Sequence, residues 1–213
     1  MQFSEFTTVA LHIAGKDWRE SRRILVLLTA GLLIPAAMVR VGGPDAEDFA
    51  MGLLAGMLAG TSFGYAQYCF LIERQRGTLE TLLCLPIHPH ELVLAKYVSV
   101  YSMVLFTVNV PALLVPQPRL LYVANGAALF LATVFMAATI VSEKPWAFQL
   151  PVWGLLLFVL PTKQLLESYY PTGMGPFLAV LAHPLRLTTA ALLVTPLIVA
   201  ASAFVFSRAT SRD

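Results

Sequence analysis

Six apolar runs divide the chain and leave it few folds to adopt. A helix of about 20 residues crosses a hydrocarbon core of roughly 30 Å, and five of the runs reach that length comfortably. Lipid offers no hydrogen-bond partners, so such runs cross it as helices. A hydrophobic fraction of 58% and a mean hydropathy of +0.74 agree. We predict an all-α polytopic membrane protein with spans at about 24–41, 49–72, 97–115, 120–141, 146–161 and 187–206.

The first 23 residues precede these runs and form a segment of their own. They lack the short apolar core and cleavage site of a signal peptide. Phe6, Val9 and Ile13 recur at helical spacing, and polar residues that include Lys16 and Asp17 take most other positions. This pattern predicts an amphipathic helix on the cytoplasmic face of residues 24–213, the six-span transmembrane domain. The helix either lies in the interface with Trp18 at headgroup level or is an ordinary surface helix before a span.

The basic residues predict the orientation. With the N-terminus inside, ten of the fourteen Lys and Arg residues fall in inner segments, including Arg22-Arg23 at the edge of the first span. Cytoplasmic loops carry such an excess, so we expect both termini and the loop after the second span in the cytoplasm. A net charge of only +2 does not suggest nucleic acid. Residues 177–182 are too short to span and predict a re-entrant or interfacial helix on the outer face, between the last two spans.

The charged segment Glu73–Lys96, reading ERQRGTLETLLCLPIHPHELVLAK, lies between the second and third spans. Charge concentrated there, in a chain only 12% charged, indicates a loop that contacts something in water. Gly77 breaks the preceding helix, Thr78 is a suitable N-cap, and Pro86 cannot continue the helix that follows. The segment therefore predicts a short helix over residues 78–85.

The two ends of this segment carry further local signals. Leu79, Leu82 and Leu83 give the short helix an apolar face, and Glu80 is expected opposite them in the first turn, where a carboxylate suits the helix dipole. His88-Pro89 begins a second helix, with Pro89 at a tolerated first position and Glu91 near the positive end. That helix continues through Lys96 into the third span.

Two motifs in the chain resemble a known family. E-R-x-R-G-T-L-E-x-L-L-x-x-P followed by H-E-L-x-x-x-K resembles the cytoplasmic coupling loop of type-two ABC-exporter (ABC-2-like) permeases, the transmembrane subunits of ATP-binding-cassette exporters. The N-terminal Lys16-Asp17-Trp18-Arg19-Glu20 is similar to the end of the family's first helix. The family usually has Ser, Thr or Asp where this chain has His88-Pro89. The matching loop positions are Glu73, Arg76, Gly77, Thr78, Leu79, Glu80, Leu82, Leu83, Pro86, Glu91, Leu92 and Lys96.

The resemblance implies a partner, because the chain has no G-x-x-x-x-G-K-[ST] motif of its own. A separate ABC ATPase subunit, in two copies, would bind ATP and Mg²⁺ and dock on the loop. A second permease copy, identical or related, would complete the transporter in the bacterial inner membrane. The chain itself is then not an enzyme and needs no cofactor. The residues expected to couple to the ATPase are Glu73, Arg76, Gly77, Thr78, Leu79, Glu80, Leu83, Pro86, Glu91 and Lys96.

Small and polar residues within the spans suggest packing or a substrate path. Gly52, Gly56, Gly60 and Gly64 repeat at four-residue spacing in the second span. Such a stripe allows close helix packing, here against another span of the same subunit, or borders the substrate path. Polar groups in spans more often bond across helices than bind substrate. The packing or pathway candidates are Gly52, Gly56, Gly60, Gly64, Phe63, Gln67 and Asn109.

No Lys, Arg, Asp or Glu lies in the interior of a predicted span, since Arg40 stands at the outer end of the first, and this argues against a proton-coupled pump. Cys69 and Cys84 are expected near the cytoplasmic face, where disulfides are rare, and Cys84 with His88 and His90 makes a poor zinc site. The substrate would be amphipathic or hydrophobic: a drug, peptide, lipid or haem. A haem-exporter-like permease of cytochrome c maturation and a non-transporting scaffold or assembly factor remain alternatives. An intramembrane enzyme would need catalytic groups that are not visible.

Overall fold

The computed structural model describes residues 3–41, 57, 60–84, 87–112, 118–141 and 184–210, and every element in these ranges is helical. This confirms the all-α class. The short elements are the π-helix η1 (Gln67–Leu71), α3 (Ile72–Gln75) and α4 (Thr78–Leu83). The long ones are α1 (Phe3–Val41), α5 (Pro89–Ala112), α6 (Pro118–Val141) and α9 (Pro184–Thr210).

Four of these helices, α1, α5, α6 and α9, are long and apolar enough to cross a membrane. They match the predicted first, third, fourth and sixth spans, and α9 continues a turn beyond its predicted end. The second span is described only at Met57 and from Gly60 onward, where it is helical up to Gln75. The fifth span and the predicted external helix at 177–182 lie outside the described residues.

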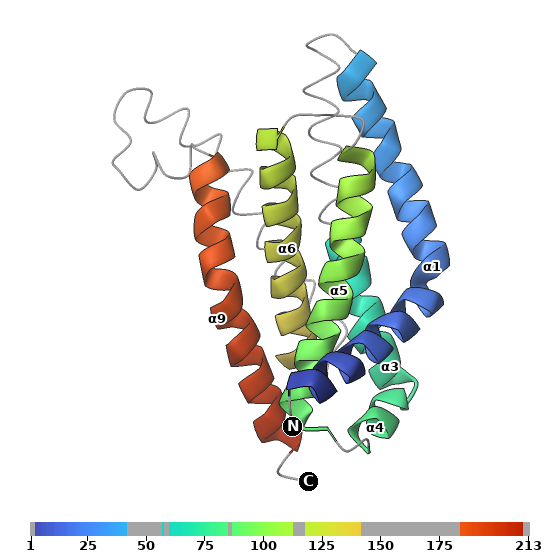
Figure 1. Ribbon diagram of the computed structural model, residues 1–213, viewed down its shortest axis with the longest axis vertical. Coiled ribbons are helices and arrows are strands. Elements are labelled where there is room, and N and C mark those ends of the chain that lie inside the picture. Colours follow the sequence, from blue (N-terminus) through green and yellow to red (C-terminus); the bar gives the residue numbers. More distant parts are fainter. Residues whose placement is uncertain are drawn as a thin grey trace.

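The N-terminal helix and the first span are one continuous helix, α1, without a boundary at residue 23. Figure 1 shows α1 bending so that its N-terminal half crosses the N-terminal half of α5. Ser21 Oγ donates to the Asp17 carbonyl at 2.5 Å, a bond of the kind that bends helices. The N-terminal half therefore packs one face on the bundle, and its predicted position at the membrane surface stays a prediction.

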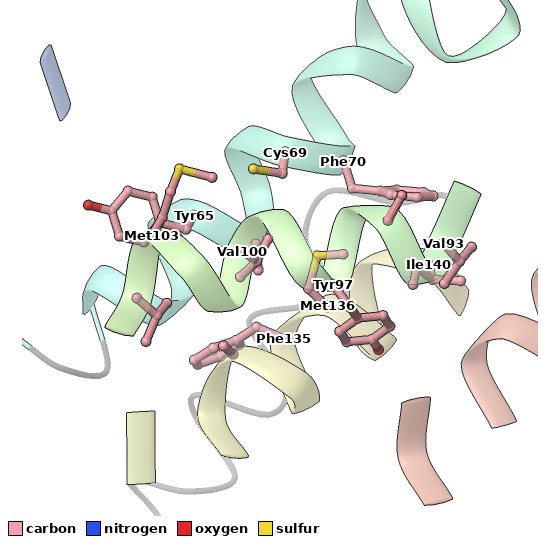
Figure 2. Packing of buried hydrophobic residues seen from close by; sticks show 14 of the residues in the cluster. Tyr65, Cys69, Phe70, Val93, Tyr97, Val100, Met103, Phe135, Met136 and Ile140 are labelled. Carbon is pink, nitrogen blue, oxygen red and sulfur yellow. The ribbon is translucent and has the colours of Figure 1, made fainter. Parts of the chain in front are cut away.

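Helix α5 is the centre of the described bundle, in contact with α1, η1, α4, α6 and α9. A helix surrounded in this way is apolar on all sides, as the sequence of α5 is after its first turns. Figure 2 shows the buried side chains of α5 between those of residues 65–70 and those of α6. They are Val93, Tyr97, Val100 and Met103 from α5, with Tyr65, Cys69 and Phe70 on one side and Phe135, Met136 and Ile140 on the other.

One end of the bundle gathers the polar parts of the chain. The start of α1, the end of α9, the start of α5 and the short helix α4 all lie at this end in Figure 1. Helix α3 lies there too, directly before α4 in the chain. The arrangement agrees with the predicted loop after the second span and puts the loop on the same side as both ends of the described chain.

Two glycines of the predicted stripe, Gly60 and Gly64, lie in the described residues. A Cβ at either would meet no atom within 4 Å, so no close contact of these two is seen there; Gly52 and Gly56 lie outside the described residues. A Cβ at Gly126 of α6, in contrast, would collide with the Thr188 side chain of α9. The close approach of helices permitted by a small residue thus occurs between α6 and α9.

This contrast predicts a difference between two matched variants. Gly126→Leu should separate α6 from α9 and lower the free energy of unfolding by about 1–3 kcal/mol, the usual cost of overpacking. Gly60→Leu should leave it nearly unchanged in the isolated subunit. Thermal unfolding of both variants in detergent measures the difference, and equal midpoints would contradict the inferred α6–α9 contact.

Candidate functional site

Four charged side chains from three helices meet at the polar end of the bundle. We call them the charge cluster: Lys16 and Asp17 of α1, Glu73 of α3 and Lys96 of α5. Lys96 Nζ donates to Asp17 Oδ1 at 2.9 Å and to Asp17 Oδ2 at 3.1 Å. The Lys96 side chain is 0% exposed and that of Asp17 is 3% exposed. This pair joins α1 to α5 across 79 residues of sequence.

Glu73 extends the cluster to α3. Its Oε2 lies 2.7 Å from Lys96 Nζ, as an ion pair rather than a directed hydrogen bond. Its Oε1 accepts a 2.6 Å hydrogen bond from Lys16 Nζ, which itself is about one-third exposed. Lys16 also lies 3.9 Å from Glu20 on its own helix. The charges therefore alternate from Lys16 through Glu73 and Lys96 to Asp17.

This alternation allows the charges to be buried. A buried ion is very costly unless it is paired and hydrogen-bonded. Two cations and two carboxylates balance formally, and the most buried of them, Lys96, has a carboxylate from each of two other helices. Removing one member of such a set leaves an uncompensated charge, which is strongly destabilising. The cluster therefore specifies how α1, α3 and α5 meet.

Neighbouring contacts fix α1 in this position. Trp18 Nε1 donates to Ser102 Oγ at 2.8 Å, and the Trp18 ring packs edge-on against Phe106 with centroids 5.2 Å apart. The Tyr68 hydroxyl donates to the backbone carbonyl of Glu20 at 2.9 Å. Trp18 is thus a contact between α1 and α5.

The spacing of residues in α1 indicates that Asp17 is buried, although the sequence pattern placed Asp17 among the polar positions of this helix. Ala10, Ile13, Ala14, Asp17 and Ser21 follow one another at three- or four-residue spacing, and all are buried. Asp17 therefore lies on the face that packs against the bundle, not on the polar face. A carboxylate at such a position predicts a buried cation as its partner, although periodicity alone does not identify Lys96.

Helix α4 is attached to the cluster through Glu73. Gly77 has φ +71°, a left-handed conformation that ends the preceding helix and that glycine adopts without strain. Thr78 is the first residue of α4, and its hydroxyl donates to the Glu73 carbonyl at 3.2 Å. Thr78 thus connects α4 to α3. The sequence predicted instead that this hydroxyl would act as an N-cap and accept a hydrogen bond from its own helix. Glu73 holds the charge cluster with its side chain and α4 with its backbone.

The start of α5 agrees with the sequence. Pro89 is the first helical residue, and Glu91 Oε2 accepts from the backbone N–H of His88 at 2.9 Å. This bond is the carboxylate half of a capping box, which satisfies a backbone donor that the helix itself leaves free. His88 and Pro89 therefore begin the helix well, although they differ from the residues usual in the resembled family.

The expected coupling residues separate into three groups. Glu73 and Lys96 are buried in the charge cluster and do not face water, contrary to the expectation for a water-contacting loop. Leu79 is buried and Leu83 half-buried against the core, so the apolar face of α4 packs on its own chain. The third group is at least partly accessible: Arg76, Gly77 and Thr78 are exposed and Glu91 is half-buried. Of the other two residues, the backbone of Glu80 lies in α4, and Pro86 lies outside the described residues.

The packing and pathway candidates are dispersed. Phe63 packs edge-on against Phe135 of α6 with centroids 5.3 Å apart, and Gln67 begins η1. Asn109 and Asn125 exchange amide hydrogen bonds of 3.0 and 3.1 Å between α5 and α6, as expected for polar groups that bond across helices. Cys69 is buried and Cys84 exposed, and both are free thiols.

Comparison of the chain with known protein families, characterised proteins and solved structures finds no match. The function of the charge cluster must therefore be inferred from its geometry. Each member of the charge cluster is paired with another member, so the cluster is a junction of three helices with the short helix α4 attached.

Proposed function

We propose that the chain is the transmembrane permease subunit of an ABC exporter, which moves an amphipathic or hydrophobic substrate with energy from ATP hydrolysis by a separate subunit. The sequence resemblance around Glu73–Lys96 suggests this class, and four membrane-spanning helices suit it. Two ATPase copies would supply ATP and Mg²⁺ binding, and a second permease copy would complete the pathway.

One observation supports this proposal most: α4 is joined to Glu73, whose side chain binds both Lys16 of α1 and Lys96 of α5. A force applied to α4 from outside the bundle therefore acts on three helices at once. Gly77 limits the link between α3 and α4 to a single tight turn. A subunit driven by a partner needs such a rigid connection between its docking element and its spans.

The decisive experiment is purification of the full chain with the products of neighbouring genes. We expect an ATPase with P-loop motifs to copurify at one ATPase per permease and to show substrate-stimulated ATP hydrolysis after reconstitution in vesicles. Copurification with non-ATPase assembly proteins alone would favour the scaffold alternative. Copurification of haem-maturation proteins together with the ATPase would favour the haem-exporter-like alternative.

The proposed orientation, with both termini and α4 in the cytoplasm, can be tested by labelling a cysteine that the chain already has. Cys84 directly follows α4 and is exposed, whereas Cys69 is buried. An impermeant maleimide should therefore leave the wild-type chain unlabelled in intact cells and label it in inverted vesicles. The Cys84→Ser variant, which removes the reactive thiol, is the matched control. Labelling of Cys84 in intact cells would reverse the orientation and exclude docking of a cytoplasmic ATPase on α4.

A further inference from the structure

Helix α1 carries a continuous exposed stripe that changes character along its length. Its positions follow at intervals of one or three residues, which keeps them on one helix face. The first three are arginines, and every later one is Ala, Val, Leu or Ile. The exposed stripe consists of Arg19, Arg22, Arg23, Val26, Leu27, Ala30, Leu33, Ile34 and Ala37.

The apolar part of the stripe indicates what surrounds it. Val26 is 63% exposed and Leu27 is 72% exposed, on a helix that is long and apolar enough to span a membrane. Lipid chains are the medium in which such a face is stable. The three arginines continue the same face toward the polar end of the bundle, so they lie where the hydrocarbon gives way to headgroups.

We propose that Arg19, Arg22 and Arg23 form a binding surface for anionic phospholipid headgroups. Residues three and four apart on a helix are neighbours, so Arg19 is adjacent to both Arg22 and Arg23. Two guanidinium groups can then hold one phosphate through charge-assisted hydrogen bonds. Long arginine side chains also reach from the edge of an apolar face to the headgroup level.

The carboxylates nearby do not cancel this surface. Asp17 is buried and held by Lys96, while Glu20 beside the stripe lies 3.9 Å from Lys16. Positive charge therefore remains on the exposed face. The surface depends only on α1 and not on the transporter proposal. An acidic protein partner would need a wetted face, but here the arginines border directly on the lipid-facing apolar stripe.

Native mass spectrometry of the full chain in a neutral detergent tests the proposal, with phosphatidylglycerol, phosphatidylcholine and inorganic phosphate as probes. We expect phosphatidylglycerol to bind more tightly than phosphatidylcholine, and added salt to weaken only the former. An arginine near an anionic surface strengthens binding about fivefold, so R22Q/R23Q should bind phosphatidylglycerol about 30-fold more weakly. Its binding of phosphatidylcholine should not change.

Two further variants make the test specific. Arg76→Gln removes an exposed arginine from the α3–α4 turn, off the stripe, and should bind phosphatidylglycerol like the wild type. R22K/R23K keeps the charge and should retain most of the binding, whether or not R22Q/R23Q folds. Equal binding of the two lipids, wild-type binding by a folded R22Q/R23Q, or loss of binding in a folded R22K/R23K would overturn the proposal. Equally tight binding of inorganic phosphate would assign the surface to a free anion instead.

Discussion

Replacing Lys96 by methionine is expected to destabilise the chain more than any other single change in the charge cluster. Methionine keeps the length of the side chain and removes the charge that faces Asp17 and Glu73. Breaking a buried ion pair by removal of one partner costs about 3–5 kcal/mol, because the remaining charges stay buried. For a chain of this size that corresponds to a fall in the unfolding midpoint of about 6–20 °C, measurable by thermal unfolding in detergent.

Two controls separate the ion pairing from loss of packing. Lys16→Met removes the partly exposed end of the alternating set, and Glu73 keeps Lys96, so the cost should be smaller than that of Lys96→Met. Adding Asp17→Asn to Lys96→Met removes one orphaned carboxylate, and Glu73 still has Lys16, so part of the stability should return. If Lys96→Met unfolds at the wild-type temperature, the cluster does not specify the junction of α1, α3 and α5.

Charge reversal at Glu80 is expected to abolish the proposed coupling to an ATPase while leaving the chain itself intact. Glu80 lies in the short helix α4 and not in one of the four helices long enough to cross a membrane, so Glu80→Arg should reach the membrane at normal levels. An interface built around a carboxylate loses at least tenfold in affinity when that charge is reversed. We expect weak recruitment of the ATPase, or recruitment without substrate-stimulated hydrolysis, measured by copurification and by turnover in vesicles.

The matched control is His90→Arg, which adds a cation at an exposed position at the start of α5, outside α4. It should recruit and stimulate the ATPase like the wild type. Leu83→Asp, the obvious second variant on α4, is a poor test because Leu83 packs against the core and its loss destabilises the chain directly. Wild-type recruitment and turnover in Glu80→Arg would show that α4 does not transmit force from the ATPase.

Local signals in the sequence predicted a large part of this fold. Gly77 ends a helix, Pro89 begins one, and Glu91 caps it, because each of these effects depends on a few adjacent residues. The apolar runs likewise predicted four helices of the right length and position. The change from mixed to apolar composition at residue 23 does not end the helix, because it alters the surroundings of a helix and not its backbone.

The sequence by itself determined the helices, their ends and the medium that suits them, since hydropathy and capping act over a few turns of chain. Only the tertiary structure decided which charges are buried together. Lys16 and Glu73 are 57 residues apart, and Asp17 and Lys96 are 79 apart. Their pairing depends on how α1 crosses α5, which is set by side-chain packing such as that of Trp18 against Phe106. Two motifs distant in sequence therefore form one cluster, because helix packing brings together charges that could not be buried separately.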